Sequence, residues 1–380
     1  EYLSQYDKIP VPSEIPLQKP FEKVRELEME YSITESEPEE ENSYLSYNVV
    51  VGDSLDVETC TAFEVLDYTL LSAPGAPLKQ ALLDAGIGKD IMGSYEDGIY
   101  QPFFSIVAKN ANPQDKEKFV SLIQTTLKEI AENGVDQKAI AAGINYMEFR
   151  FREADFSSFP KGLMYGIDVF DSWLYDDSKP FDHVMRLAVF EKLKEKANTG
   201  YFEELIEKYL LTNTHASIVV VNPKRGLAVQ EDRELEEKLA AYKASLSQEE
   251  IQRLVEDTRH LKAYQDEPET EEALRTIPLL KRSDIGKEAA KLYNTEKKVG
   301  DTLVLHHNLY TNGIGYLDLL FDLKQVPEHL IPYLGILKSV LGYVDTAHYK
   351  YGELFNEINA RSGGITFGIQ VFGDAQDNSR

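Results

Sequence analysis

Strand-like and helix-like segments follow one another in this sequence in an order that occurs twice. The first occurrence has two strands, two helices and two strands, over 23–34, 43–52, 56–71, 77–84, 90–96 and 99–109. A mostly helical segment over 112–210 and a closing strand over 216–221 follow. Helices on one face of an antiparallel sheet would bury both kinds of apolar pattern. We therefore predict an α+β layered domain over 23–225, preceded by an extended, proline-rich linker over 1–22.

The second occurrence lies in the last hundred residues. Its predicted elements are strands at 299–306 and 314–323 paired through a turn at 311–313, helices at 327–341 and 351–360, and a strand at 365–371. This repeated order indicates an internal duplication. The second copy lacks a helical block and a closing strand before Arg380, so we interpret 276–380 as the N-terminal part of a further domain. We expect its unpaired edge strand to pair with a neighbouring molecule or to be mobile.

Two narrow apolar stripes at helical spacing separate the two copies. They consist of Leu235, Leu239, Tyr242 and Leu246, followed by Ile251, Leu254, Val255, Thr258 and Leu261. Between them, Ser247 and Glu250 have the spacing of a capping box, which starts a helix. Two amphipathic helices with so short a connection are expected to fold back on each other. The sequence therefore predicts an antiparallel helical hairpin over 226–275.

Charge and the distribution of apolar residues exclude several classes of protein. The formal net charge is −25, and we find no basic patch, so nucleic acid is not an expected partner. No apolar run approaches the roughly 20 residues that span a bilayer, and no targeting segment is present. A start without Met and with many prolines suggests an excised piece of a longer protein. The single cysteine, Cys60, is expected to be a small core residue.

No arrangement of residues in this sequence predicts a catalytic, cofactor-binding or metal site. The seven histidines are His183, His215, His260, His306, His307, His329 and His348, and no two stand four apart, as H-x-x-E-H requires. The nearest approach is 325–329, where Gln325 replaces the first histidine and Pro327 interrupts the helix. Nucleophile elbows and phosphate-binding loops are also missing. Paired carboxylates are common, but 65 acidic residues make such pairs expected on a solvated surface.

Several segments together resemble the presequence-protease family, a branch of the pitrilysin/insulinase zinc metalloendopeptidases. They are the proline-rich start, 73–82 after a long helix, the stripes over 235–261, 311–314 before a strand, and 326–333 at a helix start. The resemblance covers essentially the whole chain. It implies four homologous pitrilysin-like domains around a closed chamber, joined at the middle by a helical hairpin. Residues 1–225 would be the second, non-catalytic domain, 226–275 the hairpin and 276–380 the front part of the third.

The resemblance also implies where the chemistry of the whole protein would lie. The zinc ligands would precede Glu1, and an Arg and a Tyr that hold substrate would follow Arg380. The helix that bears H-x-x-E-H in the first domain has counterparts here at 57–71 and 328–341, and neither has a histidine at a ligand position. Zinc is therefore expected in the parent enzyme and not on this chain. The expected partner is a peptide substrate, enclosed together with an N-terminal catalytic domain and the C-terminal domains.

These implications give a leading hypothesis and two alternatives. The chain would be the non-catalytic chamber wall and hinge of a zinc metalloendopeptidase that degrades unstructured peptides, in the cytoplasm of a bacterium or an organelle matrix of a eukaryote. The first alternative is a structural or interaction protein of the same fold that has lost catalysis. The second, an unrelated peptide-binding module, requires a complete third domain, which the count of predicted strands does not support. The chain by itself is not expected to be an enzyme.

Overall fold

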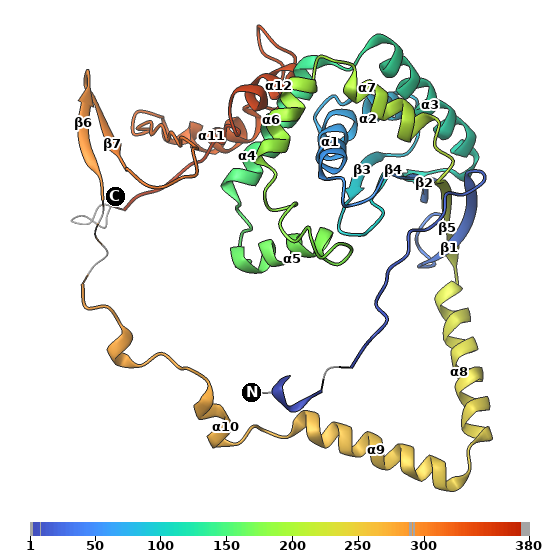
Figure 1. The fold of residues 1–380 in the computed structure, drawn as a ribbon. Coiled ribbons are helices and arrows are strands. Elements are labelled where there is room, and N and C mark those ends of the chain that lie inside the picture. The colour runs from blue at the N-terminus through green and yellow to red at the C-terminus, as the bar shows by residue number, and fades with distance from the viewer. Residues whose placement is uncertain (1–2, 8, 289–290, 292, 374–380) are drawn as a thin grey trace. The chain divides into compact units, whose positions relative to one another are not determined.

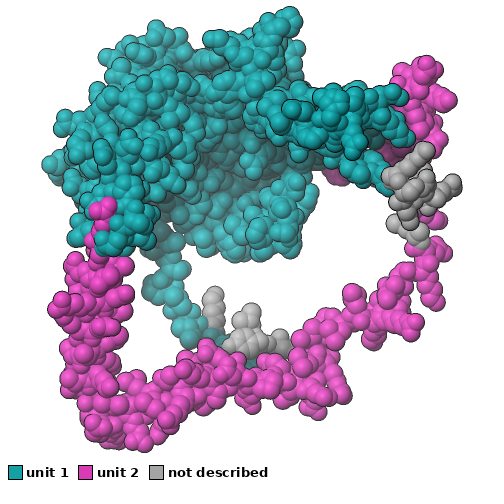
Figure 2. All heavy atoms as spheres, turned by 180° about the vertical axis from the view of Figure 1, so that it is seen from behind, with its two compact units in different colours: residues 1–224, 312–380 teal, residues 225–311 magenta. Residues whose placement is uncertain are grey.

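The computed structural model describes residues 3–7, 9–288, 291 and 293–373 (Figure 1). The chain divides into two compact units (Figure 2). One unit comprises residues 1–224 together with 312–380, and the other comprises residues 225–311. No helix in the described part of the chain combines the length and apolar character that a membrane crossing needs.

A five-stranded sheet forms the base of the first unit. Its strands are β1 (Arg25–Ile33), β2 (Ser43–Val50), β3 (Asp90–Glu96), β4 (Phe103–Ala111) and β5 (Ala216–Arg225), in the order β1-β5-β2-β4-β3. Strand β2 pairs antiparallel with β4 and β5, and β3 pairs antiparallel with β4. Tyr47 in the central strand lies opposite Ile106 on one side and Ile218 on the other. Strand β1 lies beside β5 at the edge, and the sheet as a whole is mixed.

Helices follow the strands in the predicted order. The first unit contains η1 (Leu3–Gln5), α1 (Val57–Asp67), the π-helical turn η2 (Tyr68–Ser72), α2 (Pro77–Asp84), η3 (Pro113–Asp115), α3 (Lys116–Asn133), α4 (Gln137–Glu153), α5 (Lys161–Trp173), α6 (Leu187–Lys196), α7 (Tyr201–Leu205) and η4 (Ile206–Leu211). The predicted α+β fold class is confirmed; the domain bounds 23–225 stay a prediction. Strand β4 starts later than predicted because Pro102 has no N–H to donate to a ladder; its carbonyl accepts from the Val51 N–H at 2.7 Å instead.

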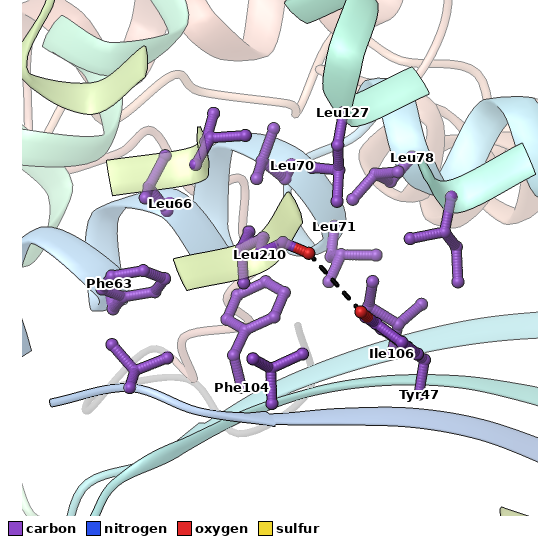
Figure 3. Close-up of a cluster of buried hydrophobic side chains, with 14 of the residues drawn as sticks. Tyr47, Phe63, Leu66, Leu70, Leu71, Leu78, Phe104, Ile106, Leu127 and Leu210 are labelled. Carbon is purple, nitrogen blue, oxygen red and sulfur yellow. Dashed lines mark hydrogen bonds between the residues drawn. The ribbon is translucent and has the colours of Figure 1, made fainter. Parts of the chain in front are cut away.

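The hydrophobic core lies between the sheet and the helices (Figure 3). Every second residue of β2 is buried, so one face of the strand packs inward. The side chains drawn and labelled in this core are Tyr47, Phe63, Leu66, Leu70, Leu71, Leu78, Phe104, Ile106, Leu127 and Leu210. The Tyr47 hydroxyl donates to the Leu210 carbonyl at 3.5 Å, which gives the one polar atom of this group a partner. Each fully buried Leu, Ile or Phe contributes about 1.5–3 kcal/mol through removal from water.

The second unit contains the two helices predicted between the copies. Its elements are α8 (Leu227–Ser245), α9 (Gln248–Asp266), α10 (Glu271–Thr276), η5 (Arg282–Asp284), β6 (Thr295–Val299) and β7 (Thr302–His306). The capping box of Ser247 and Glu250 starts α9 as predicted. No residue of α8 or α9 is buried, and the side-chain packing that a hairpin needs is not shown. The hairpin over 226–275 stays a prediction.

The last part of the chain differs most from its prediction. Helices η6 (Glu328–Leu330), α11 (Ile331–Val340) and α12 (Tyr351–Arg361) lie where helices were predicted. The strands predicted at 314–323 and 365–371 are wrong, because these residues have no strand structure.

The predicted pairing of 299–306 with 314–323 is therefore also wrong. β7 pairs with β6 around a two-residue turn, in which Gly300 has φ +60°. The tight turn next to β7 closes a shorter loop than the turn at 311–313, and shorter loops lose less conformational entropy. The assignment of 276–380 to a further domain stays a prediction.

Candidate functional site

Helix α1 is the predicted counterpart of a metal-binding helix. The face that it turns toward the sheet is buried. The Asp56 side chain caps its start, accepting from the Thr59 N–H at 3.1 Å. Cys60 and Phe63 are buried against the sheet and neighbouring helices, and this confirms the prediction for Cys60. Burial raises the pKa of the Cys60 thiol to about 12, so the thiol stays protonated and is not a nucleophile near neutral pH.

The acidic residues on the other face of α1 are paired with basic residues at and beside α6. Glu64 forms an ion pair with Arg186, which immediately precedes α6, and both side chains are less than one fifth exposed. Glu58 pairs with Lys196, and its second carboxylate oxygen lies 3.9 Å from the Lys192 ammonium. These pairs hold α1 against α6 and place side-chain cations beside Glu58 and Glu64.

Helix α4 is held to α6 in the same way. Glu148 is buried, and its carboxylate lies 2.6 Å from the Lys194 ammonium and 2.7 Å from Arg152 Nε. Burial acts to raise the pKa of Glu148, but the two cations outweigh it and leave that pKa below its usual value. The carboxylate therefore stays ionised, and α1, α4 and α6 form one group of helices joined by ion pairs.

A cluster of carboxyl groups from three elements surrounds Arg186. Glu64 lies on α1, Asp97 between β3 and β4, and Asp168 and Asp171 one turn apart on α5. Burial, and then Asp97 and Asp168, raise the pKa of Asp171 to about 7. Burial likewise raises the pKa of Glu64 to about 7, although Arg186 opposes this shift. Four carboxyl groups around one guanidinium leave an excess of negative charge, which favours protonation.

One predicted non-ligand, His183, lies beside this carboxyl cluster. Its Nε2 is 2.7 Å from the Ser54 carbonyl oxygen, and burial lowers its pKa, so the ring is a neutral, hydrogen-bonded core residue. His215 is also buried and packs edge-on against Phe21. The other five histidines are exposed: His260, His306, His307, His329 and His348. Within the described residues, no three His, Cys, Asp or Glu side chains form a group that could hold a metal ion.

Sequence patterns did not reveal the carboxyl cluster. Asp168 and Asp171 have helical i, i+3 spacing, which is a weak signal that they share a face. Asp97 lies about seventy residues earlier, and Arg186 follows a helix break, so no local pattern connects them. Only the tertiary structure brings these groups near Arg186.

Two protein-family models match the chain. Residues 1–147 match the family described as "Peptidase M16 inactive domain". Residues 221–380 match a family described as associated with M16 peptidases of subfamily C. Together the two models cover most of the sequence.

Curated relatives match the chain over nearly its full length. HypA of Clostridium perfringens is 41% identical over 379 residues, which is 100% of this chain and 39% of that protein. Presequence protease 1, chloroplastic/mitochondrial, of Arabidopsis thaliana is 31% identical over 374 residues, 96% of this chain and 34% of that protein. A solved peptidase M16 inactive domain from Pseudomonas fluorescens is 13% identical, with a TM-score of 0.39 over 56% of this chain and 47% of that chain. The chain thus spans less than two fifths of the length of the two curated relatives.

Proposed function

This chain belongs to the presequence-protease family of M16 peptidases, and from that premise we propose that it is the non-catalytic chamber wall and hinge of a zinc metalloendopeptidase. The whole protein would hydrolyse unstructured peptides. The zinc and the general base that activates its water would come from a domain outside this chain. The acidic surface, with a formal net charge of −25, would favour cationic peptides.

One observation supports the non-catalytic role above the others. On α1, where the family's active domain carries its metal ligands, Cys60 has a protonated thiol and Glu64 is held by the Arg186 guanidinium. The Arg186 guanidinium already pairs with this carboxylate. These residues do not fit a zinc ion, because the Cys60 side chain is buried in the core and the Glu64 carboxylate is already paired with Arg186.

The hinge part of the proposal concerns the connection between the two layered parts. Helices α8 and α9 have no buried residue and carry many charged side chains, so each is a solvated helix, and a capping box starts α9. Such a connection can transmit the motion of one half of a chamber to the other without disturbing either core. The compartment would be the bacterial cytoplasm or an organelle matrix, and the name of the Arabidopsis relative places that protein in chloroplasts and mitochondria.

The proposal is tested by comparing the full-length protein with this chain alone. We expect the full-length protein to contain one zinc ion, measured by elemental analysis, and to cleave an unstructured cationic peptide. We expect this chain to do neither. Stoichiometric zinc with peptide cleavage by the chain alone would contradict the proposal.

A variant of α1 tests whether the Glu64 carboxyl group takes part in zinc binding or peptide cleavage. Glu64→Gln in the full-length protein should leave both the zinc content and the cleavage rate unchanged, because no step involves this carboxyl group. If the full-length protein neither binds zinc nor cleaves peptide, the alternative of an assembly or interaction protein with this fold is favoured.

A further inference from the structure

Helix α12 is seated on helix α4, although the two are about two hundred residues apart (Figure 1). Asn359 is 3% exposed, and its Nδ2 donates to the Tyr68 hydroxyl at 2.7 Å. Asn145 Nδ2 donates to the carbonyl oxygens of Asn359, at 2.5 Å, and of Ser362, at 3.1 Å. Burial raises the pKa of Tyr68 to about 12, so its hydroxyl is neutral at any physiological pH. The side-chain amides of Asn359 and Asn145 are therefore hydrogen-bonded in buried and half-buried positions. Loss of either partner would leave a polar group without a hydrogen bond, which lowers stability.

Small residues surround this polar contact and let the two backbones approach. Tyr68, Ala73, Ala76 and Ala142 form a separate buried cluster, against which Phe355 and Ala360 of α12 pack. A Cβ atom on Gly363 would lie 2.1 Å from the Phe149 ring, and one on Gly352 would lie 3.0 Å from the Pro74 carbonyl oxygen. The surface is therefore shaped to fit glycine at both ends of α12.

Further contacts extend the surface along α4 in both directions. Lys138 at the start of α4 lies 3.5 Å from Glu357. At the end of α4, Asn312 Nδ2 donates to the Arg152 carbonyl at 3.0 Å, and the Tyr316 hydroxyl donates to Glu153 at 3.0 Å. We call the surface made by α4 with Tyr68 and residues 73–76 the α4 seat. By contrast, no residue of α11 is buried.

We propose that the third domain docks on the α4 seat, with α12 as its anchor. The two layered domains are then joined in two ways: by this non-covalent contact and by the connecting residues 226–275. This inference rests on the proposed function only in assigning α12 to the third domain. The anchor depends on its seat: a helix of 11 residues is marginal by itself in water, so α12 is expected to be helical only while it is docked. Protection of its amides therefore measures docking directly.

The first test is hydrogen exchange of the α12 amides in the full-length protein. Tyr68→Phe removes the acceptor of the buried Asn359 amide, and we expect exchange over 351–361 to become roughly tenfold faster. Tyr351→Phe is the matched control, because it deletes the same hydroxyl from the exposed side of α12 and should change nothing. Equal effects of the two variants, or α12 amides in the unaltered protein that exchange as fast as those of α9, would overturn the proposal.

The second test uses steric exclusion. Gly363→Ala forces a methyl group into the Phe149 ring, so exchange over 351–361 should rise about 10- to 100-fold. Gly335→Ala on α11 meets nothing within 4 Å and should leave exchange over 351–361 unchanged. Amides of β2 and β4 should stay protected in both variants, which shows that the second domain is folded.

Peptide cleavage is measured on the same samples to keep the two proposals apart. Suppose that the α12 amides lose protection in Gly363→Ala and that the unaltered protein does not cleave peptide. This result would contradict the proposed function and support docking on the α4 seat. If the α12 amides stay protected in Gly363→Ala and the unaltered protein cleaves peptide normally, only the proposal of docking on the α4 seat would be contradicted.

Discussion

Helices α1 and α11 have similar apolar patterns and opposite surroundings. Eight residues of α1 are buried, and Leu66 near its end is fully buried. Leu337, in the middle of α11, is 50% exposed, and no residue of that helix is buried. The strands repeat the contrast, since every second residue of β2 is buried whereas all five residues of β7 are exposed.

The difference lies in what each helix has to pack on. Helix α1 lies between a five-stranded sheet and the helices α4 and α6. Residues 314–323 and 365–371, which were predicted to form the corresponding sheet near α11, have no strand structure. An apolar pattern therefore predicts where a helix lies, and a partner surface decides whether the helix becomes part of a core.

The largest effect is expected from truncating equivalent leucines in the two helices. Leu66→Ala leaves a cavity in the core and should lower the free energy of unfolding by about 2–5 kcal/mol. Leu337→Ala removes a half-exposed side chain and should change it by less than about 0.5 kcal/mol. Urea unfolding of this chain, followed by circular dichroism, measures both. Similar losses in the two variants would break the contrast, because they would show that α11 is buried in solution.

A smaller effect is expected from ion pairs in the two environments. Glu148→Gln removes the charge that faces Lys194 and Arg152 in a buried position, and should cost about 1–3 kcal/mol. Asp257→Asn on α9 removes one partner of the exposed pair with Arg253 and should cost little or nothing in the same urea unfolding measurement.

The pH dependence of the Glu148 pair gives an independent check. Because the pKa of Glu148 is lowered in the folded state, its contribution is present above the unfolded pKa and is lost as the pH falls through the folded pKa. The difference in unfolding free energy between the unaltered chain and Glu148→Gln should become smaller as the pH falls. A gap that is the same at every pH would mean that the carboxylate acts through packing and not through charge.

The smallest effect is expected from the carboxyl cluster around Arg186. The folded-state pKa values of Glu64 and Asp171 are raised to about 7, so protonation favours the folded state. This stabilisation is complete below the unfolded pKa values and is lost as the pH rises through about 7. In the unaltered chain the unfolding free energy should therefore fall between about pH 5 and 8. Asp171→Asn should make this fall smaller by roughly 1 kcal/mol or less, because solvent screens the half-buried group.

The exposed neighbour Asp177 provides the control for that measurement. Asp177→Asn removes the same charge outside the cluster and should leave the pH profile of stability unchanged. If the unfolding free energy of the unaltered chain instead rises over this pH range, Arg186 neutralises the cluster completely.

Much of the first domain could be predicted because its signals are local. Strand β3 and helix α2 have the predicted bounds, Asp90–Glu96 and Pro77–Asp84, since each is a short periodic segment between turn residues. The start of α9 was also predicted, because Ser247 and Glu250 satisfy each other's backbone groups within one turn. Where a prediction was wrong, as at 314–323, the local pattern was strand-like but no partner strand was supplied.

The sequence by itself determined the positions of most helices and of the strands in the first sheet, because alternation, helical spacing and caps act between residues a few positions apart. Only the tertiary structure decided which of those segments are buried, that Arg186 meets carboxyl groups from three elements, and that α12 rests on α4 through Asn359 and Tyr68. Burial and pairing require contacts between residues far apart in the chain, and their free energy depends on a complementary surface that no local pattern specifies.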